Sequence, residues 1–176
     1  MVNLDEPAPD FSVTTNKGTI SLSDFRGKWV VLFAYPADFT PICEADTIGF
    51  ARKKFEFNEL DVQFIGWSVD SVDTHNRWIE EIKDRVGVQI DYPLIADVDK
   101  KLAERYGILH KAKGVTYRGV FIIDPDGILR FKATYPLEVG RNTKEIERIV
   151  KVLQRARELS HLKELDRARE LSKYNE

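Results

Sequence analysis

The sequence predicts an α/β fold, with a mixed central sheet, flanking helices and a C-terminal helical extension. Two observations support this prediction: short apolar runs alternate with helical stretches, and the last run continues through a turn into another apolar run. Strand–helix–strand connections favour parallel pairing through right-handed crossovers, and the final hairpin adds an antiparallel pair. A chain of 176 residues is the usual size of one domain.

Four segments are predicted strands. Residues 29–35 (WVVLFAY) form an apolar run without polar alternation, which suits a strand covered on both faces. Residues 62–69 (VQFIGWSV) and 120–123 (VFII) have similar composition. The turn residues 125–127 (PDG) separate the third run from residues 128–131 (ILRF) and indicate a hairpin, since Pro presets φ and Gly accepts positive φ.

Three segments that mix apolar and charged residues are predicted helices: residues 43–58, 73–85 and 99–106. Asp73 is the expected N-cap of the second. Asn142 is the expected N-cap of a last helix, because Glu145 follows at the capping-box spacing.

The C-terminal segment contains a repeat. RARELS occurs at residues 155–160 and again at 167–172. We expect one domain over residues 1–155 and a helical tail over residues 156–176. The apolar residues of the tail recur every third position, a step about 60° short of a helical turn, so a straight helix would not keep one apolar face. Three interpretations stay open: a break near Ser160, packing on more than one surface including a partner protomer, or a solvated terminal helix.

Composition limits the classes of function. With 27 basic and 29 acidic residues the net charge is −2, which gives no electrostatic footprint for nucleic acid. No apolar run approaches the ~18 residues of a membrane span, and the N-terminus does not resemble a secretory signal. The single cysteine excludes an intramolecular disulfide and a Cys-rich zinc site. We expect a soluble, cytoplasmic protein that binds neither nucleic acid nor membrane and needs no metal or cofactor.

That cysteine has an unusual setting. Cys43 ends the segment FAYPADFTPIC, in which a buried strand leads through two prolines into the predicted helix. The first turn of a helix has unpaired N–H groups and a positive dipole end, and both favour a thiolate over a thiol. The Thr40 hydroxyl can point into the same pocket, and Pro36 can shield the sulfur without offering an N–H. The alternative is a passive, buried cysteine.

The spacing P-x-x-x-T-x-x-C, here Pro36, Thr40 and Cys43, resembles the active-site motif of the peroxiredoxins, especially their six-type, one-cysteine branch. The resemblance covers about residues 3–155. It includes four further segments: APDF (8–11), GWSVDS (66–71), RGVFIIDPDG (118–127) and YPLEVGRN (135–142). It implies a thioredoxin-like fold and a thiol peroxidase.

The resemblance also implies residue roles. Cys43 would attack a peroxide oxygen and become a sulfenic acid. Thr40 would hydrogen-bond the peroxide, and Pro36 would screen the sulfur. Arg118 matches the arginine beside the thiolate that contacts substrate. Arg141 matches a second arginine of the substrate pocket, with a surface arginine at the start of the last helix as the alternative.

Three further residues need interpretation. Trp78 either walls the pocket or belongs to the core, and the core is the simpler expectation. His75 and His110 have no metal-ligand spacing, so surface or loop positions are expected for both. Residues 124–127 (DPDG) resemble part of a calcium loop, which the turn explains.

The chain also departs from the family pattern. It has no second cysteine, so the sulfenic acid needs either an external thiol reductant, such as a thioredoxin-like protein or a small thiol, or a cysteine in a C-terminal arm outside this sequence. Asp46 stands where the family usually has Glu to bridge the arginines. The resemblance implies a long C-terminal dimerisation arm, which we expect to be largely missing or replaced by the repeat-bearing tail. A homo-oligomer, either a dimer or a ring of dimers, is nevertheless expected.

Other functions remain open beside thiol peroxidase. A disulfide exchanger is disfavoured because C-x-x-C is missing. An oligomeric holdase chaperone or a peroxide sensor could use the same fold, and catalytic consumption of peroxide would separate the enzyme from the holdase.

Overall fold

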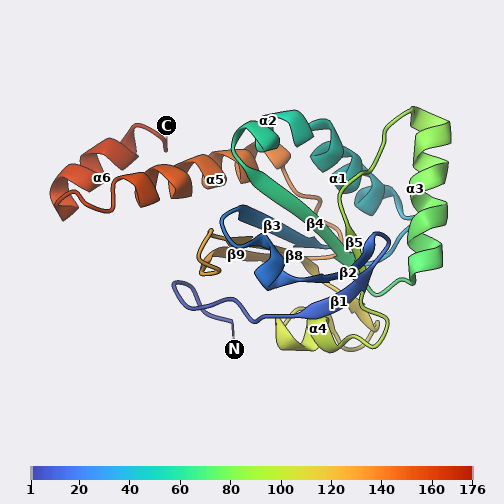
Figure 1. Cartoon of the computed structure of the whole chain (residues 1–176). Helices are drawn as coiled ribbons and strands as arrows, with labels where there is room; N and C mark the ends of the chain where they lie inside the picture. The colour runs from blue at the N-terminus through green and yellow to red at the C-terminus, as the bar shows by residue number, and fades with distance from the viewer. Residues whose placement is uncertain (1, 176) are drawn as a thin grey trace. The chain divides into compact units, whose positions relative to one another are not determined.

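The computed structural model describes residues 2–175, which divide into two compact units after Arg141. The first unit is built on a seven-stranded sheet with the strand order β2-β1-β5-β4-β3-β8-β9 (Figure 1). Its strands are β1 (Ser12–Thr15), β2 (Gly18–Ser21), β3 (Trp29–Ala34), β4 (Val62–Ser68), β5 (Leu94–Ala96), β8 (Arg118–Ile123) and β9 (Leu129–Tyr135). Strands β6 (Leu109–His110) and β7 (Val115–Thr116) form a separate pair.

The predicted mixed sheet is confirmed. Strand β3 runs parallel to β4 and antiparallel to β8, while β4 runs parallel to β5. Strands β8 and β9 form the predicted hairpin, with a register shift beside Ile123. Every residue of β3 and of β8 is buried, as expected for central strands covered on both faces.

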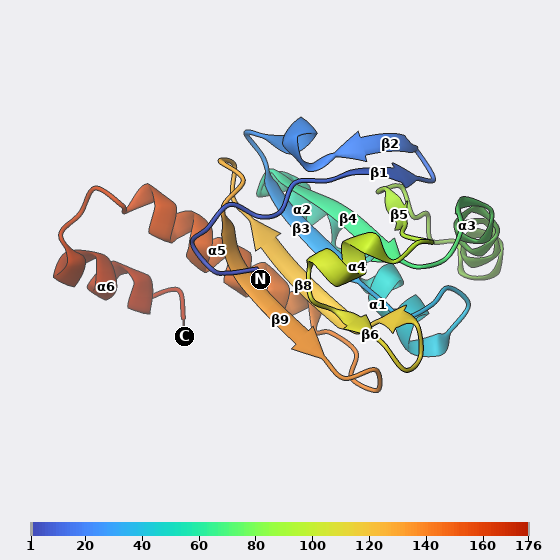
Figure 2. The same cartoon turned by 90° about the horizontal axis from the view of Figure 1, so that it is seen from below.

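Helices cover both faces of this sheet. The helical segments of the first unit are η1 (Leu22–Phe25), α1 (Pro41–Arg52), α2 (Lys54–Glu59), α3 (Val72–Val86) and α4 (Lys101–Arg105). Helix α4 lies on the opposite side of the sheet from α1 and α2 (Figures 1 and 2). Successive residues of β3 point to opposite faces of the sheet. Leu32 packs in the hydrophobic core that includes Tyr106, the residue after α4. The Phe33 ring faces the other way and stacks 4.3 Å from the ring of Phe50 on α1.

Two helix predictions need correction. The predicted helix over residues 43–58 begins at Pro41 and is divided into α1 and α2 at Lys53. Asp73 is not an N-cap, because α3 begins at Val72 and the Ser71 hydroxyl accepts the backbone N–H of Thr74. A serine preceding the first helical residue satisfies that first-turn donor before Asp73 is reached.

The second unit contains α5 (Thr143–Glu158) and α6 (Glu164–Ser172). The Asn142 side chain caps α5, as predicted, by accepting two backbone N–H groups. The tail breaks between the two helices, close to the predicted position. Within this unit, Arg148 donates to Asn175 at 2.9 Å and the Arg155 guanidinium lies over the Tyr174 ring. The predicted domain boundary at residue 155 falls inside α5 and stays a prediction.

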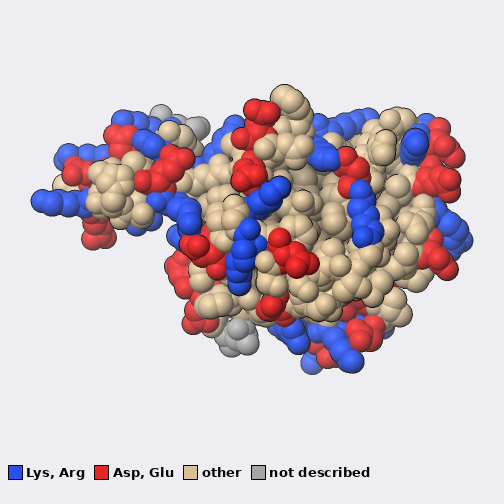
Figure 3. Space-filling view, viewed as in Figure 1, with Lys and Arg blue, Asp and Glu red and all other residues tan. Residues whose placement is uncertain are grey.

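No helix within residues 2–175 is both long and apolar enough to cross a membrane. On the face drawn in Figure 3, basic and acidic side chains are interspersed and neither charge dominates a large area. This face therefore gives no electrostatic footprint for a polyanion.

Candidate active site

Cys43 lies in the first turn of α1. The helix begins with Thr40 as the extended N-cap residue and Pro41 at the first helical position, where a missing N–H costs nothing. Cys43 is therefore the third helical residue, in the turn whose N–H groups lack partners within the helix. Its side chain is fully buried and its thiol is free. Burial alone would suit the passive interpretation of this cysteine, so its neighbours decide between the two.

A buried arginine points at the sulfur. Arg118, the first residue of β8, donates from Nη1 to the Cys43 Sγ at 3.3 Å. Its Nε donates to the Leu137 carbonyl at 2.7 Å, which fixes the plane of the guanidinium. Arg118 is only 3% exposed. A buried guanidinium held against a sulfur offers hydrogen-bond donors to any anion formed beside it.

Asp46 joins the two predicted arginines. One turn after Cys43 on α1, its carboxylate accepts from the backbone N–H of Arg141 at 3.0 Å and from Arg141 Nε at 2.9 Å. The same carboxylate lies 3.9 Å from Arg118 Nη1. Asp46 therefore makes the bridge between the two arginines.

Arg141 is buried, so the surface interpretation is wrong. Its Nη1 donates to the carbonyls of Ala34 on β3 and Gly119 on β8, at 2.5 and 2.7 Å. Its guanidinium also lies 5.5 Å from the centre of the Phe33 ring. Burial lowers the pKa of Arg141, and Asp46 opposes this effect. These contacts make Arg141 a brace between the strands and Asp46, while its buried Nη2 has no hydrogen-bond partner among the described residues.

The remaining motif residues lie in the loop between β3 and α1. The Thr40 hydroxyl donates to the Ala37 carbonyl at 2.8 Å, which leaves its lone pairs available as acceptors. Pro36 is half-buried and follows Tyr35 directly after β3. The structure thus brings Thr40 and Cys43 to one helix start, with Arg118 against the sulfur.

The expected surface position of His75 is wrong. His75 is fully buried on α3, where its Nδ1 lies 2.6 Å from Oδ2 of the buried Asp38. The spacing of His75, Trp78 and Ile82 by three and four residues places all three on the buried face of α3, and this periodicity could have revealed it. His110 is half-buried at the end of β6.

Trp78 is fully buried beneath the loop. Its ring lies 5.5 Å from that of Tyr35 and 6.4 Å from that of Phe39. This burial confirms the interpretation of Trp78 as a core residue. Within residues 2–175, no three His, Cys, Asp or Glu side chains are grouped so as to hold a metal ion.

The mixed sheet is that of a thioredoxin-like fold. The buried Cys43 thiol lies at the start of the helix that follows the central strand β3, and a guanidinium donates to it. This combination is typical of a thiol-dependent redox enzyme. Residues 4–132 match the AhpC/TSA family, and the chain belongs to this family.

Several known proteins are similar over most of the chain. It is 50% identical to a peroxiredoxin of Thermoplasma volcanium over 153 residues, which are 87% of this chain and 75% of that protein. It is 46% identical to a peroxiredoxin of Aquifex aeolicus over 156 residues, covering 87% and 70% of the two chains. The enzyme is thus a thiol-dependent peroxidase.

Two solved structures agree with the fold. A cysteine-to-serine mutant of peroxiredoxin 6 from Arenicola marina superimposes with a TM-score of 0.82 at 34% identity, over 88% of this chain and 74% of that one. A yeast mitochondrial 1-Cys peroxiredoxin, described with its resolution by glutathione and thioredoxin systems, gives 0.83 at 36% identity, over 91% and 80%.

Proposed function

We propose that Cys43 is the nucleophile that reduces hydrogen peroxide and organic hydroperoxides. The observation that carries this proposal is the 3.3 Å hydrogen bond from the buried Arg118 guanidinium to the Cys43 sulfur. The thiolate attacks the terminal peroxide oxygen, a sulfur–oxygen bond forms and the O–O bond breaks. The leaving oxygen takes a proton and departs as water or an alcohol, and Cys43 is left as a sulfenic acid.

Three neighbours support this step. Arg118 can stabilise both the thiolate and the negative charge that develops on the leaving oxygen. Thr40, whose own hydrogen is committed to Ala37, can accept the hydrogen of the hydroperoxide and orient it. Pro36, in the same loop, has no backbone N–H and so adds no donor that would compete for the sulfur.

We further propose that an external thiol reduces the sulfenic acid, because Cys43 is the only cysteine of the sequence. A first thiol condenses with the sulfenic acid to a mixed disulfide and releases water. A second thiol attacks that disulfide, which returns Cys43 to the thiol and leaves the reductant as a disulfide. A thioredoxin-like protein and a small thiol both supply this chemistry.

We also propose that the protein is a homo-oligomer, a dimer or a ring of dimers, and that it acts in the cytoplasm. Phe39, beside the site, is 50% exposed and Val139 is 45% exposed, and apolar side chains of this size are readily covered by a second protomer. A cytoplasmic location suits a cysteine that must return to the thiol, since reducing compartments preserve it. Cell fractionation tests the location.

Replacement of the nucleophile tests the function. We expect Cys43→Ser to abolish peroxide consumption with an unchanged circular dichroism spectrum, because a serine hydroxyl does not ionise at neutral pH. A matched control adds Ser160→Cys to Cys43→Ser and so restores a thiol at an exposed position between α5 and α6. Turnover by either variant would contradict the proposed role of Cys43.

A further inference from the structure

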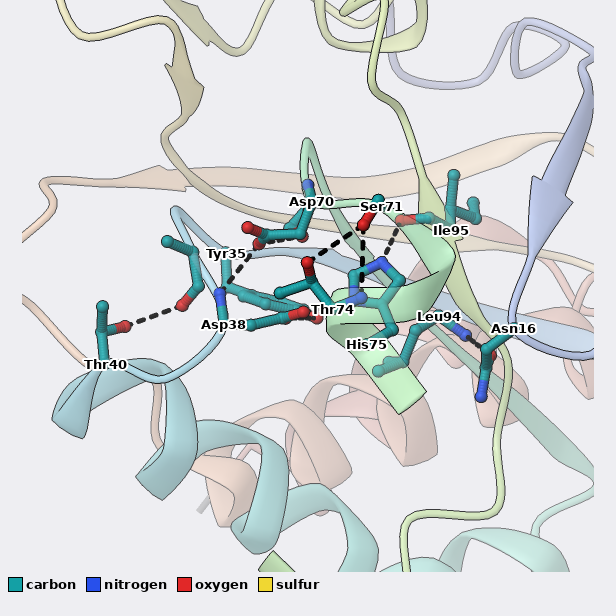
Figure 4. Close-up of polar contacts among 12 residues, drawn as sticks. Asn16, Tyr35, Asp38, Thr40, Asp70, Ser71, Thr74, His75, Leu94 and Ile95 are labelled. Carbon is teal, nitrogen blue, oxygen red and sulfur yellow. Dashed lines mark hydrogen bonds and ion pairs between the residues drawn. The ribbon is translucent and has the colours of Figure 1, made fainter. Parts of the chain in front are cut away.

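A cluster of polar side chains, all buried except the half-buried Asp70, holds the loop that leads to Cys43. We call Tyr35, Asp38, Ser68, Asp70 and His75 the loop-anchoring cluster (Figure 4 labels all of these except Ser68). The Asp38 carboxylate accepts the Tyr35 hydroxyl at 2.7 Å with one oxygen and faces His75 Nδ1 at 2.6 Å with the other. The Asp38 backbone N–H donates to Asp70 at 2.8 Å, and the Ser68 hydroxyl donates to the same Asp70 oxygen at 2.7 Å.

The contacts of His75 fix where its protons lie. Its Nε2 is 3.0 Å from the Ile95 carbonyl on β5, and a carbonyl only accepts, so Nε2 must carry a hydrogen. A neutral imidazole would then present the lone pair of Nδ1 to Asp38. A second hydrogen must therefore lie between Nδ1 and Asp38, whichever of the two groups holds it. The pair is thus a proton-sharing bridge between α3 and the loop, with no net charge.

Asp38 belongs to the loop that carries the motif residues. It lies between Ala37, whose carbonyl accepts the Thr40 hydroxyl, and Phe39. Phe39 has a φ of 60°, a left-handed conformation that L-residues adopt only where the surroundings hold them. The start of the loop is also held, because the Thr116 hydroxyl donates to the Tyr35 carbonyl at 2.8 Å. The position of Thr40 therefore depends on how firmly Asp38 is fixed.

We propose that Asp38 and His75 are a positioning pair that fixes the loop of residues 36–40, and with it Thr40, for the attack of Cys43 on peroxide. This inference rests on the proposed function of Cys43. Cys43 itself is held by α1, and Arg118 is held by β8 and the Leu137 carbonyl. Loss of the pair should therefore impair the reaction with peroxide, which needs the loop, far more than the reactivity of the thiol.

Two reactions of Cys43 separate these effects. Stopped flow measures the second-order rate constant of Cys43 with hydrogen peroxide, and mass spectrometry measures its rate of alkylation by iodoacetamide, which does not use the Thr40 hydroxyl. The loss variants are His75→Leu and Asp38→Ala. Tyr35→Phe is a milder variant that removes one hydroxyl and keeps the ring, so a folded protein is available if the other two fail.

Asp38→Asn is the matched rescue variant. Its amide can donate to the lone pair of a neutral His75 at Nδ1, while its carbonyl oxygen accepts the Tyr35 hydroxyl. Both contacts then persist without a shared proton. A carboxylate needed only for its charge would not be replaced by this amide, whereas a positioning residue would be.

We expect His75→Leu and Asp38→Ala to react with peroxide about 10- to 100-fold more slowly, the scale of a misplaced binding group. Tyr35→Phe should be slowed less, and alkylation should stay within about threefold of wild type in every variant. Asp38→Asn should be clearly faster with peroxide than Asp38→Ala.

Three results would overturn the proposal: wild-type peroxide rates in the loss variants, equal losses in the peroxide and alkylation reactions, or an Asp38→Asn rate as low as that of Asp38→Ala. Failure of the proposed function is a separate result, since wild-type Cys43 would then be alkylated without reacting with peroxide.

Discussion

Arg118 is the residue whose contacts bear most directly on the chemistry. One nitrogen donates to the Cys43 sulfur, a second donates to a backbone carbonyl, and Asp46 lies 3.9 Å away. The guanidinium is therefore fixed before any substrate arrives. Such preorganised donors stabilise charge that develops in a transition state without a cost of reorganisation at that moment.

The variant Arg118→Ala should slow the reaction with peroxide by about 10²–10³-fold, the usual effect of removing one preorganised donor. The reason is that Arg118 acts on the leaving oxygen as well as on the thiol. The rate should be measured across pH, up to values at which the thiol is fully ionised. A defect that disappears there would show that Arg118 only promotes ionisation.

The sequence predicted the motif residues but not the residues that hold them. Pro36, Thr40, Cys43, Arg118 and Arg141 were found from local motifs, and the structure places all five in the first unit. The contact between Asp38 and His75 joins residues 37 positions apart. No local pattern encodes it, because burial of two ionisable groups is tolerated only where the tertiary fold supplies each with a partner.

At the scale of elements, hydrophobic burial explains which strands were predictable. Strands β3 and β4 are apolar runs in the centre of the sheet and were predicted from composition. Strands β1 and β2 were missed because they are short, largely exposed and rich in Thr and Ser. Strand β5 has only three residues, too few for a periodicity.

The bridge between α3 and the loop predicts a pH dependence of stability. Burial lowers the pKa of His75, but the contacts with Asp38 and the Ile95 carbonyl and the charge of Asp70 together raise that pKa above its ordinary value. Burial also raises the pKa of Asp38. Above about pH 6.5 the unfolded chain loses the His75 proton, whereas the folded pair keeps it. The free energy of unfolding should therefore decrease as pH rises from about 6.5 towards the pKa of the folded pair, by up to about 1.4 kcal/mol per unit of pH.

Denaturant titrations at a fixed protein concentration from pH 6 to 9 would measure this effect. Asp38→Asn is the control, because its neutral His75 no longer retains a proton in the folded state. Above pH 6.5 the free energy of unfolding should depend less on pH in that variant than in the wild type. An equal dependence in both proteins would show that another group causes it.

At the scale of the whole molecule, the exposed Phe39 bears on the proposed association with a second copy of the chain. Phe39 is half exposed, Thr40 follows it directly and Cys43 lies three residues further on, so a neighbouring protomer that covers Phe39 would also enclose the site. Light scattering at micromolar concentration should give at least a dimer of the 20.3 kDa chain. A particle of the monomer mass would contradict the proposed oligomer.

The single cysteine determines what happens to the whole molecule after oxidation. The sulfenic acid of Cys43 can meet an external thiol, form a disulfide with Cys43 of another protomer, or be oxidised further to sulfinic acid. The second route requires two sulfurs within about 2 Å of each other. Cys43 is fully buried and Arg118 lies against it, so this approach is obstructed.

Excess peroxide without a reductant should therefore give sulfenic acid first, and then sulfinic or sulfonic acid, on Cys43. Intact-protein mass spectrometry with a sulfenic acid trap would follow these steps, and non-reducing gels should show little covalent dimer. A small thiol added at the sulfenic stage should restore activity, whereas the same thiol added at the sulfinic stage should not, because thiols do not reduce sulfinic acids. A disulfide-linked dimer that forms as fast as turnover would instead mean that the buried site opens to a second protomer, and that resolution occurs between two copies of Cys43.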